Sequence, residues 1–213
     1  MNPLRVIDSI SGTLKHLALA VPLAAAMWLG AGPSAQAIPT DSLIHYDFNS
    51  VSGTTVTNTG SLGSAANGTL ANATLVTGQF GNALSFTGSG SGVITNNSVV
   101  IGNAYTFACW VSTTNGNSGY KRIMLNNYQQ SGYLGTNGTG QYLTIVKDNF
   151  VHSSTSPDTG GVWHHLAMTW DGTTQKFYYD GVINTTTVPS ARNTTYTEKF
   201  GFGCNLGLVS CNN

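Results

Sequence analysis

From about residue 38 onward, the chain is divided into short apolar runs that are separated by turns rich in Gly and Asn. No segment in this part repeats apolar residues at the spacing of an amphipathic helix. Short runs between regular turn signals are typical of the strands in a β-sandwich or barrel. We therefore expect an all-β fold with one hydrophobic core, since a chain of this size buries about 70% of its unfolded surface.

The first 37 residues differ in kind from the rest. Arg5 and Lys15 precede the apolar run "LALAVPLAAAMWLG", and the small-residue sequence "AQA" ends at Ala37. This order is that of a signal peptide cleaved before Ile38. The run contains Pro22 and is shorter than the roughly 20 residues that a spanning helix needs. We expect an exported protein, extracellular, on the cell surface or periplasmic, without a stable membrane span.

The charge of the chain is low and balanced, with 8 Lys or Arg against 8 Asp or Glu and only 8% charged residues. A protein that binds nucleic acid neutralises phosphates with a basic patch or stripe, and none is visible here. Nucleic acid is therefore not an expected partner.

Three cysteines occur. Cys109 lies in the apolar run "YTFACWV" and is expected to be a small buried core residue rather than a reactive thiol. Cys204 and Cys211 lie close together near the end of the chain and can pair in an oxidising compartment. The sequence leaves this pairing open.

The segment "GGVWHHLAMTWDGTTQKFYYDGVI" (160–183) holds two adjacent histidines and two Asp-Gly pairs. The turn signals divide it into two predicted strands of a meander, "VWHHLAMTW" and "KFYY". Neighbouring side chains of a strand point to opposite faces, so His164 and His165 cannot close on one metal ion. Asp171 and Asp180 each precede a glycine at a chain reversal and are expected to be turn residues.

This segment resembles the pattern Trp-x-His-hydrophobic-Ala followed by Tyr-hydrophobic-Asp-Gly of laminin G-like domains in the concanavalin A-like lectin/glucanase superfamily. Three further segments resemble the family in the right order. "LIHYDFN" (43–49) is similar to its first strand, "GQFGNALSFTGSGSGV" (78–93) to its Gly-x-Phe-Gly signature, and "YTFACWV" (105–111) to its Thr-hydrophobic-x-x-Trp strand. Both faces of the last run carry bulky residues, which predicts a central strand covered on each side.

The resemblance implies a two-sheet antiparallel jelly-roll sandwich over residues 38–213. Family domains end with a strand beside the first one, whereas this chain ends in "GFGCNLGLVSCNN". We therefore expect a C-terminally truncated domain without its final strand. The resemblance also implies calcium as a candidate cofactor, held by oxygen atoms of rim loops, but the sequence gives it no position.

Catalytic signatures are missing from the sequence. Retaining glycosidases need two carboxyl groups about 5 Å apart, and the chain has one glutamate, Glu198, with no acidic neighbour in sequence. No nucleophile elbow, phosphate-binding loop or zinc motif occurs. We therefore expect no catalytic residues.

Binding is the remaining function. Tyr120, Tyr128 and Tyr133 lie among Asn and Gln in a loop-like segment, where aromatic rings and amides suit a sugar or simply cover strand ends. The sequence predicts a non-catalytic recognition or adhesion module that binds carbohydrate or an extracellular protein. The alternatives are an exported polysaccharide hydrolase with non-standard carboxylates and a spacer fragment of a larger surface protein.

Overall fold

The computed structural model describes residues 42–86, 90–113, 121–127, 132–137, 139–146, 149–152, 160–188 and 196–203. All of them belong to one compact unit that spans residues 35–213. Within these residues, no helix combines the length and the apolar character that a membrane crossing requires.

The described chain is built from antiparallel β-strands and a single 3₁₀ turn, η1 (Gly63–Ala66). The larger sheet has nine strands in the order β1-β2-β3-β6-β17-β9-β10-β11-β12. Its strands are β1 (Val51–Ser52), β2 (Thr55–Val56), β3 (Gly68–Ala71), β6 (Gly92–Thr95), β9 (Arg122–Asn127), β10 (Gly132–Thr136), β11 (Tyr142–Val146), β12 (Asn149–His152) and β17 (Gly201–Phe202).

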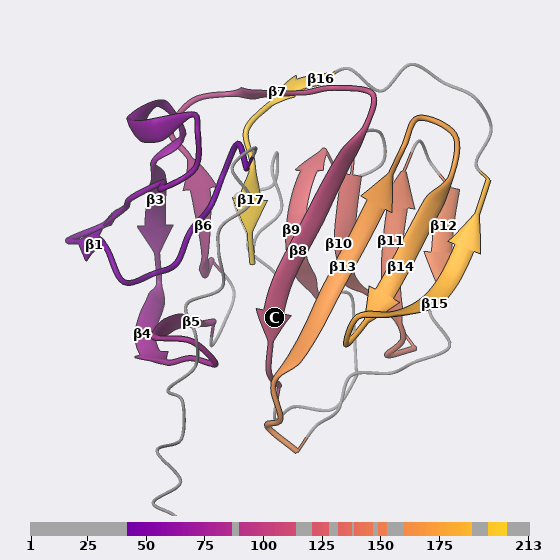
Figure 1. The fold of residues 1–213 in the computed structure, drawn as a ribbon. Coiled ribbons are helices and arrows are strands. Elements are labelled where there is room, and N and C mark those ends of the chain that lie inside the picture. The colour runs from indigo at the N-terminus through magenta and orange to yellow at the C-terminus, as the bar shows by residue number, and fades with distance from the viewer. Residues whose placement is uncertain are drawn as a thin grey trace, which may run out of the picture. The chain divides into compact units, whose positions relative to one another are not determined.

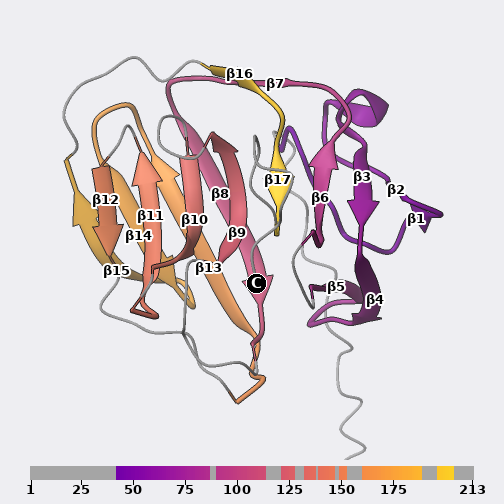
Figure 2. The ribbon, with the colours of Figure 1, turned by 180° about the vertical axis from the view of Figure 1, so that it is seen from behind.

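The second sheet has four strands in the order β15-β14-β13-β8. They are β8 (Tyr105–Val111), β13 (His164–Trp170), β14 (Gln175–Tyr179) and β15 (Val182–Thr187). Two further two-stranded sheets complete the fold: β4 (Ala73–Thr77) pairs with β5 (Asn82–Phe86), and β7 (Val99–Ile101) pairs with β16 (Tyr196–Glu198). Figures 1 and 2 show the four-stranded sheet layered against strands β9 to β12 of the larger sheet.

The main core lies between these two layers. Leu166, Met168 and Trp170 of β13 are buried, as the alternation of this strand predicts, and they share one cluster with Phe177 of β14. From the opposite layer the cluster receives Met124, Leu134, Tyr142 and Val146. The predicted meander of β13 and β14 and the all-β sandwich are thus confirmed.

The expected first strand at residues 43–49 is wrong, because the structure has no strand there. The backbone of this segment is held by a loop instead. The N–H of His45 donates to Asn58 Oδ1 at 2.8 Å, and the carbonyl of His45 accepts from the N–H of Thr59 at 3.0 Å. Ile44 still packs against the core, so the apolar pattern of the segment indicates that its side chains are buried but does not indicate strand pairing.

The expectation that both faces of β8 are covered is also wrong. Among the described strands, β8 lies at one edge of the four-stranded sheet, next to β13, and β15 lies at the other edge. Phe107 on its inner face is buried, whereas Thr106 and Ala108 on its outer face are exposed. The expected lack of a final strand concerns the segment after residue 203, which lies outside the described residues, so this expectation stays a prediction.

Candidate binding face

The outer face of the four-stranded sheet is the candidate functional site, and strand alternation decides which residues it carries. β8 and β13 pair with Trp110 opposite His165, Ala108 opposite Ala167 and Thr106 opposite Thr169. Directly paired residues lie on the same side of an antiparallel sheet. Since Leu166 and Met168 point into the core, their neighbours His165 and Ala167 point outward.

The same register extends the face across β14 and β15. On β14, Tyr178 pairs with Ala167 and Lys176 pairs with Thr169. On β15, Ile183 pairs with Tyr178 and Thr186 pairs with Lys176, with a register shift between Phe177 and Tyr178. We define the outer face as Thr106, Ala108, Trp110, His165, Ala167, Thr169, Lys176, Tyr178, Ile183 and Thr186. Every member except Ala167 is partly or fully exposed, and Figure 1 shows the four strands with this face toward the viewer.

Trp110 forms the aromatic end of the outer face. The centroid of its ring lies 5.3 Å from that of His165 and 5.5 Å from that of Phe80. The planes of the Trp110 and Phe80 rings form an angle of 73°, which is an edge-to-face contact. Phe80 remains 37% exposed. An edge-to-face pair of this geometry adds about 0.5–1.5 kcal/mol beyond the area it buries, so the three rings support one another.

The turn between β4 and β5 places Phe80 against Trp110. Gly78 donates its N–H to the carbonyl of Gly81 at 2.8 Å, which closes the turn around Gln79 and Phe80. Gly81 has φ +71°, and a Cβ built there would lie 2.5 Å from Oδ1 of Asn49. This explains the Gly-x-Phe-Gly sequence: only a glycine fits the last position of the turn, and the turn presents the aromatic ring.

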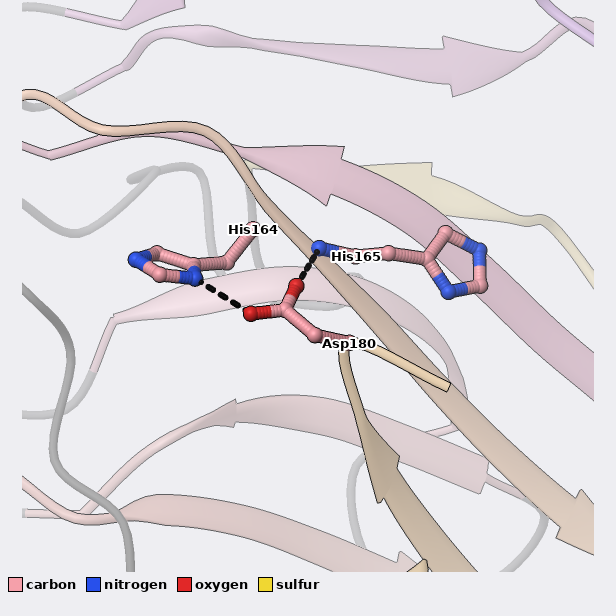
Figure 3. Close-up of polar contacts among 3 residues, drawn as sticks. All are labelled: His164, His165 and Asp180. Carbon is pink, nitrogen blue, oxygen red and sulfur yellow. Dashed lines mark hydrogen bonds and ion pairs between the residues drawn. The ribbon is translucent and has the colours of Figure 1, made fainter. Parts of the chain in front are cut away.

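Asp180 joins the ends of β13 and β14 beside this face (Figure 3). Its Oδ1 accepts the backbone N–H of His165 at 2.8 Å, and its Oδ2 accepts from Nδ1 of His164 at 2.8 Å. Its own N–H donates to the carbonyl of His165 at 2.8 Å. Asp180 is thus a turn residue as predicted, with φ +48°, but its carboxylate reaches the neighbouring strand.

Burial alone would raise the pKa of the Asp180 carboxyl. The hydrogen bonds from His164 and His165 outweigh this effect, so the pKa lies below its usual value. Asp171 behaves as the sequence predicts: its Oδ1 accepts the backbone N–H groups of Thr174 at 2.6 Å and Thr173 at 2.8 Å, and these bonds lower the pKa of its carboxyl.

The two histidines point to opposite faces of β13, as alternation predicts (Figure 3). The ring of His164 stacks on Tyr179 at 4.8 Å, whereas the ring of His165 contacts Trp110. The part of the chain that the structure describes contains no group of three or more His, Cys, Asp or Glu placed to hold a metal ion. Calcium binding stays a prediction.

Cys109 directly precedes Trp110 in β8, so its side chain lies on the opposite, inner face of the strand, where it packs against the core. It is a free cysteine, and burial raises the pKa of its thiol to about 12. A thiol with this pKa is almost fully protonated at neutral pH and is a poor nucleophile. Cys204 and Cys211 lie outside the described residues.

Of the three tyrosines that the sequence suggested as a binding site, the structure describes Tyr133 alone. Tyr133 is fully buried, and its hydroxyl donates to the carbonyl oxygens of Lys121 at 3.2 Å and Thr136 at 3.4 Å. Its ring cannot stack on a ligand, so its assignment as a ligand-binding residue is wrong. Tyr120 and Tyr128 lie outside the described residues, and their role stays a prediction.

Sequence reasoning missed the outer face, although a signal was present. On β8 and β13, short side chains alternate with large buried ones, and Thr106, Ala108, Ala167 and Thr169 have too little bulk for the middle of a core. Only the register between the two strands shows that these short residues share one face with Trp110.

Comparison with protein families identifies this architecture. A laminin G-type family, described as the Concanavalin A-like lectin/glucanases superfamily, matches residues 86–207. The chain belongs to this superfamily. Residues 86–207 include β8, β13, β14 and β15, so the outer face of this concanavalin A-like domain lies inside the matched region. No curated protein sequence matches the chain.

Solved structures show the same fold at low sequence identity. The domain is similar to the ligand binding domain of botulinum neurotoxin serotype D in complex with N-acetylneuraminic acid, with a TM-score of 0.56 and 15% identity over 77% of this chain and 42% of that chain. It is also similar to the Trypanosoma rangeli sialidase in its 2,3-difluorosialic acid covalent intermediate, with a TM-score of 0.56 and 15% identity over 78% of this chain and 27% of the sialidase. The chain therefore spans less than half the length of either protein.

Proposed function

We propose that this concanavalin A-like domain is a non-catalytic carbohydrate-binding module and that glycan binds on the outer face of the four-stranded sheet. The observation that carries this proposal is Trp110, a partly exposed indole held between Phe80 and His165 on an open sheet face. A sugar ring presents an apolar face of C–H groups and a rim of hydroxyls. An aromatic ring beside hydrogen-bonding side chains matches both features.

The surroundings of Trp110 support a sugar more than an apolar ligand. Thr106, Thr169 and Thr186 place hydroxyl groups on the outer face, and Lys176 adds an ammonium donor. A purely apolar partner would leave these polar groups without hydrogen bonds when it covered them, which costs free energy for each group. The fold similarity to a ligand binding domain crystallised with N-acetylneuraminic acid agrees with this choice but does not locate the site.

The test is affinity electrophoresis of the purified protein in gels that contain single soluble polysaccharides, with calcium and with EDTA. At least one polysaccharide should retard the wild type, and Trp110→Ala should abolish the retardation. Val100→Ala, at a residue 55% exposed on β7, is the matched control and should migrate like the wild type. If no polysaccharide retards the wild type and a glycan array is silent, the proposed function is wrong.

The same gels separate binding from hydrolysis. A binding module releases no reducing sugar from the polysaccharide that retards it. Release above a heat-inactivated control, lost on one Asp→Asn change, would instead favour the hydrolase alternative. A binding partner found only among extracellular proteins would favour the adhesion role without a glycan.

Export is part of the proposal, and it rests on the order of Arg5, the apolar run and "AQA" before Ile38. A mature exported protein would meet polysaccharides or surface glycans outside the cell. The test is N-terminal sequencing of the full chain after expression in a secreting host. A mature chain that begins at Ile38 is expected, and a secreted chain that retains residues 1–37 would contradict the cleavage site.

A further inference from the structure

We propose that the outer face binds a neutral glycan chain of at least three pyranose units, with Trp110 under one end and Tyr178 under the other. This inference rests on the proposed function and adds the length and charge of the ligand. It follows from the register of the four strands and from the charges near the face.

The separation of Trp110 and Tyr178 sets the minimum length. Ala167 on β13 pairs with Ala108 on β8 and with Tyr178 on β14, so Tyr178 lies two strands across from β8 and one same-face position along from Trp110. With strands about 4.8 Å apart and same-face residues about 6.7 Å apart, the two Cα atoms are about 12 Å apart. A single pyranose ring is too short to lie on both aromatic side chains.

The residues between the two aromatic rings leave room for a continuous ligand. Ala108 and Ala167 share a row with Tyr178 and end at Cβ, whereas His165 pairs with Trp110 in the next row and keeps its ring 5.3 Å from the indole. A middle sugar would lie over these two alanines while its neighbours stack on the aromatic residues. Tyr178 pairs with Ile183 on the edge strand β15. Ile183 is 53% exposed and extends the apolar surface to that edge.

The row of residues beside the alanines supplies hydrogen bonds along the same direction. Thr106 pairs with Thr169, Thr169 with Lys176, and Lys176 with Thr186. All four side chains are partly or fully exposed. Hydroxyl groups both donate and accept, so this row can follow the ring and exocyclic hydroxyls of an extended chain.

The charges on and beside the face favour a neutral ligand. Lys176 and His165 are the titratable groups of the outer face apart from Tyr178, and Asp180 lies at the end nearest His165. Lys176 interacts favourably with Asp171, since its charge helps to lower the pKa of that carboxyl. Lys176 is the one Lys or Arg of the outer face as defined above, so the described residues of this face present no cluster of cations to attract a polyanionic glycan.

The experiment is isothermal titration of the wild type with a homologous series, from monosaccharide to hexasaccharide, of a neutral polysaccharide that retards it. Affinity should rise up to the trisaccharide or beyond. Tyr178→Ala should weaken hexasaccharide binding about tenfold and leave disaccharide binding unchanged, because a disaccharide needs only Trp110. Val182→Ala, at a residue 69% exposed on β15, is the control and should bind all lengths like the wild type.

The outcomes separate this inference from the proposed function. Equal affinity for monosaccharide and hexasaccharide, or an equal loss for all lengths in Tyr178→Ala, would overturn the three-unit site while glycan binding through Trp110 still held. Tighter binding of acidic than of neutral polysaccharides would overturn the neutral ligand. Thermal melting of Tyr178→Ala checks that the variant is folded, and Tyr178→Phe should retain the chain-length dependence.

Discussion

His164 and Asp180 meet at the ends of β13 and β14, where Nδ1 of His164 lies 2.8 Å from Oδ2 of Asp180. The other carboxylate oxygen of Asp180 accepts the backbone N–H of His165, so one side chain binds a ring on the inner face and the backbone of an outer-face residue. The Asp-Gly sequence at this turn thus fixes the end of β13 that carries His165, which lies next to Trp110 of β8 on the outer face.

Replacing Asp180 should destabilise the fold without touching the core. Asp180→Ala removes both hydrogen bonds and places alanine at φ +48°, and it should lower the free energy of unfolding by about 2 kcal/mol at neutral pH. Asp180→Asn tolerates this backbone conformation and retains an acceptor, so it should cost about half as much. Urea denaturation measures both, and equal losses for Ala and Asn would contradict the role of the acceptor.

The contribution of Asp180 should depend on pH with a defined sign. Because the pKa of its carboxyl is lowered in the folded state, the unfolded chain takes up a proton first as the pH falls. The free energy of unfolding of the wild type should therefore exceed that of Asp180→Asn by its full amount above about pH 4, the usual pKa of Asp. This difference is lost as the pH falls through the lowered folded-state pKa. Urea titrations at decreasing pH test this, and a margin that grows toward acid pH would reverse the expected sign.

Gly81 should be far less replaceable than Gly53, although both have positive φ. Gly53 (φ +58°) has no atom within 4 Å of a built Cβ, so Gly53→Ala should cost only the conformational penalty, about 1–2 kcal/mol. At Gly81 the added Cβ also meets Asn49 Oδ1, which accepts the N–H of Asn82 at 3.0 Å. Gly81→Ala should therefore cost more than Gly53→Ala and also weaken glycan binding, as Phe80 moves from Trp110. Equal melting temperatures for the two variants would refute this role for the turn.

Thr144 and Gln175 should behave as a coupled pair in the core. Nε2 of Gln175 donates to Oγ1 of Thr144 at 2.7 Å across the two layers, and both residues are buried. Within the described residues, Oε1 of Gln175 is buried without a hydrogen-bond partner. Thr144→Val should destabilise by about 1–3 kcal/mol because it leaves the buried amide nitrogen with the weak acceptor Sδ of Met168 at 3.6 Å, whereas adding Gln175→Met should restore most of this loss. A double-mutant cycle measures the coupling, and strictly additive effects would show that the two side chains act independently.

Cys109 should resist alkylation in the native protein. With a thiol pKa of about 12, almost no thiolate is present at about pH 8. Iodoacetamide treatment followed by peptide mass spectrometry should leave Cys109 unmodified in native buffer and modify it fully in guanidinium chloride. If Cys109 of the native protein were labelled as fast as a small free thiol, the two sheets would separate far more often than the packing of Cys109 against the core implies.

The fold was largely predictable because it follows from local pattern. The alternation within β13 correctly separated His164 from His165 and placed Leu166, Met168 and Trp170 in the core. The segment around Ile44 shows the limit of this reasoning, since its apolar residues pack on the core while its backbone bonds to a loop. Alternation reports which side chains are buried, but strand pairing also requires a neighbouring strand.

The candidate site was less predictable because it depends on register between segments distant in sequence. Trp110 and His165 are 55 positions apart in the chain and adjacent only because β8 pairs with β13. Tyr133 illustrates the opposite error: a tyrosine among polar residues suggested a surface, yet both faces of β10 are buried. The candidate site argued from the described residues therefore lies on a sheet face, while Tyr120 and Tyr128 stay a separate prediction.

The alternation of β8 and β13 also separates two tasks within single strands. Phe107, Leu166 and Met168 stabilise the fold from one side, while Ala108, Trp110 and His165 face outward and contribute little to the interior. The outward residues can therefore be exchanged in combination, by evolution or by a library, with small effects on folding. In protein-engineering terms, the sheet is a scaffold whose outward positions can be varied while the core is kept, with the contacting rings of Trp110 and His165 varied together.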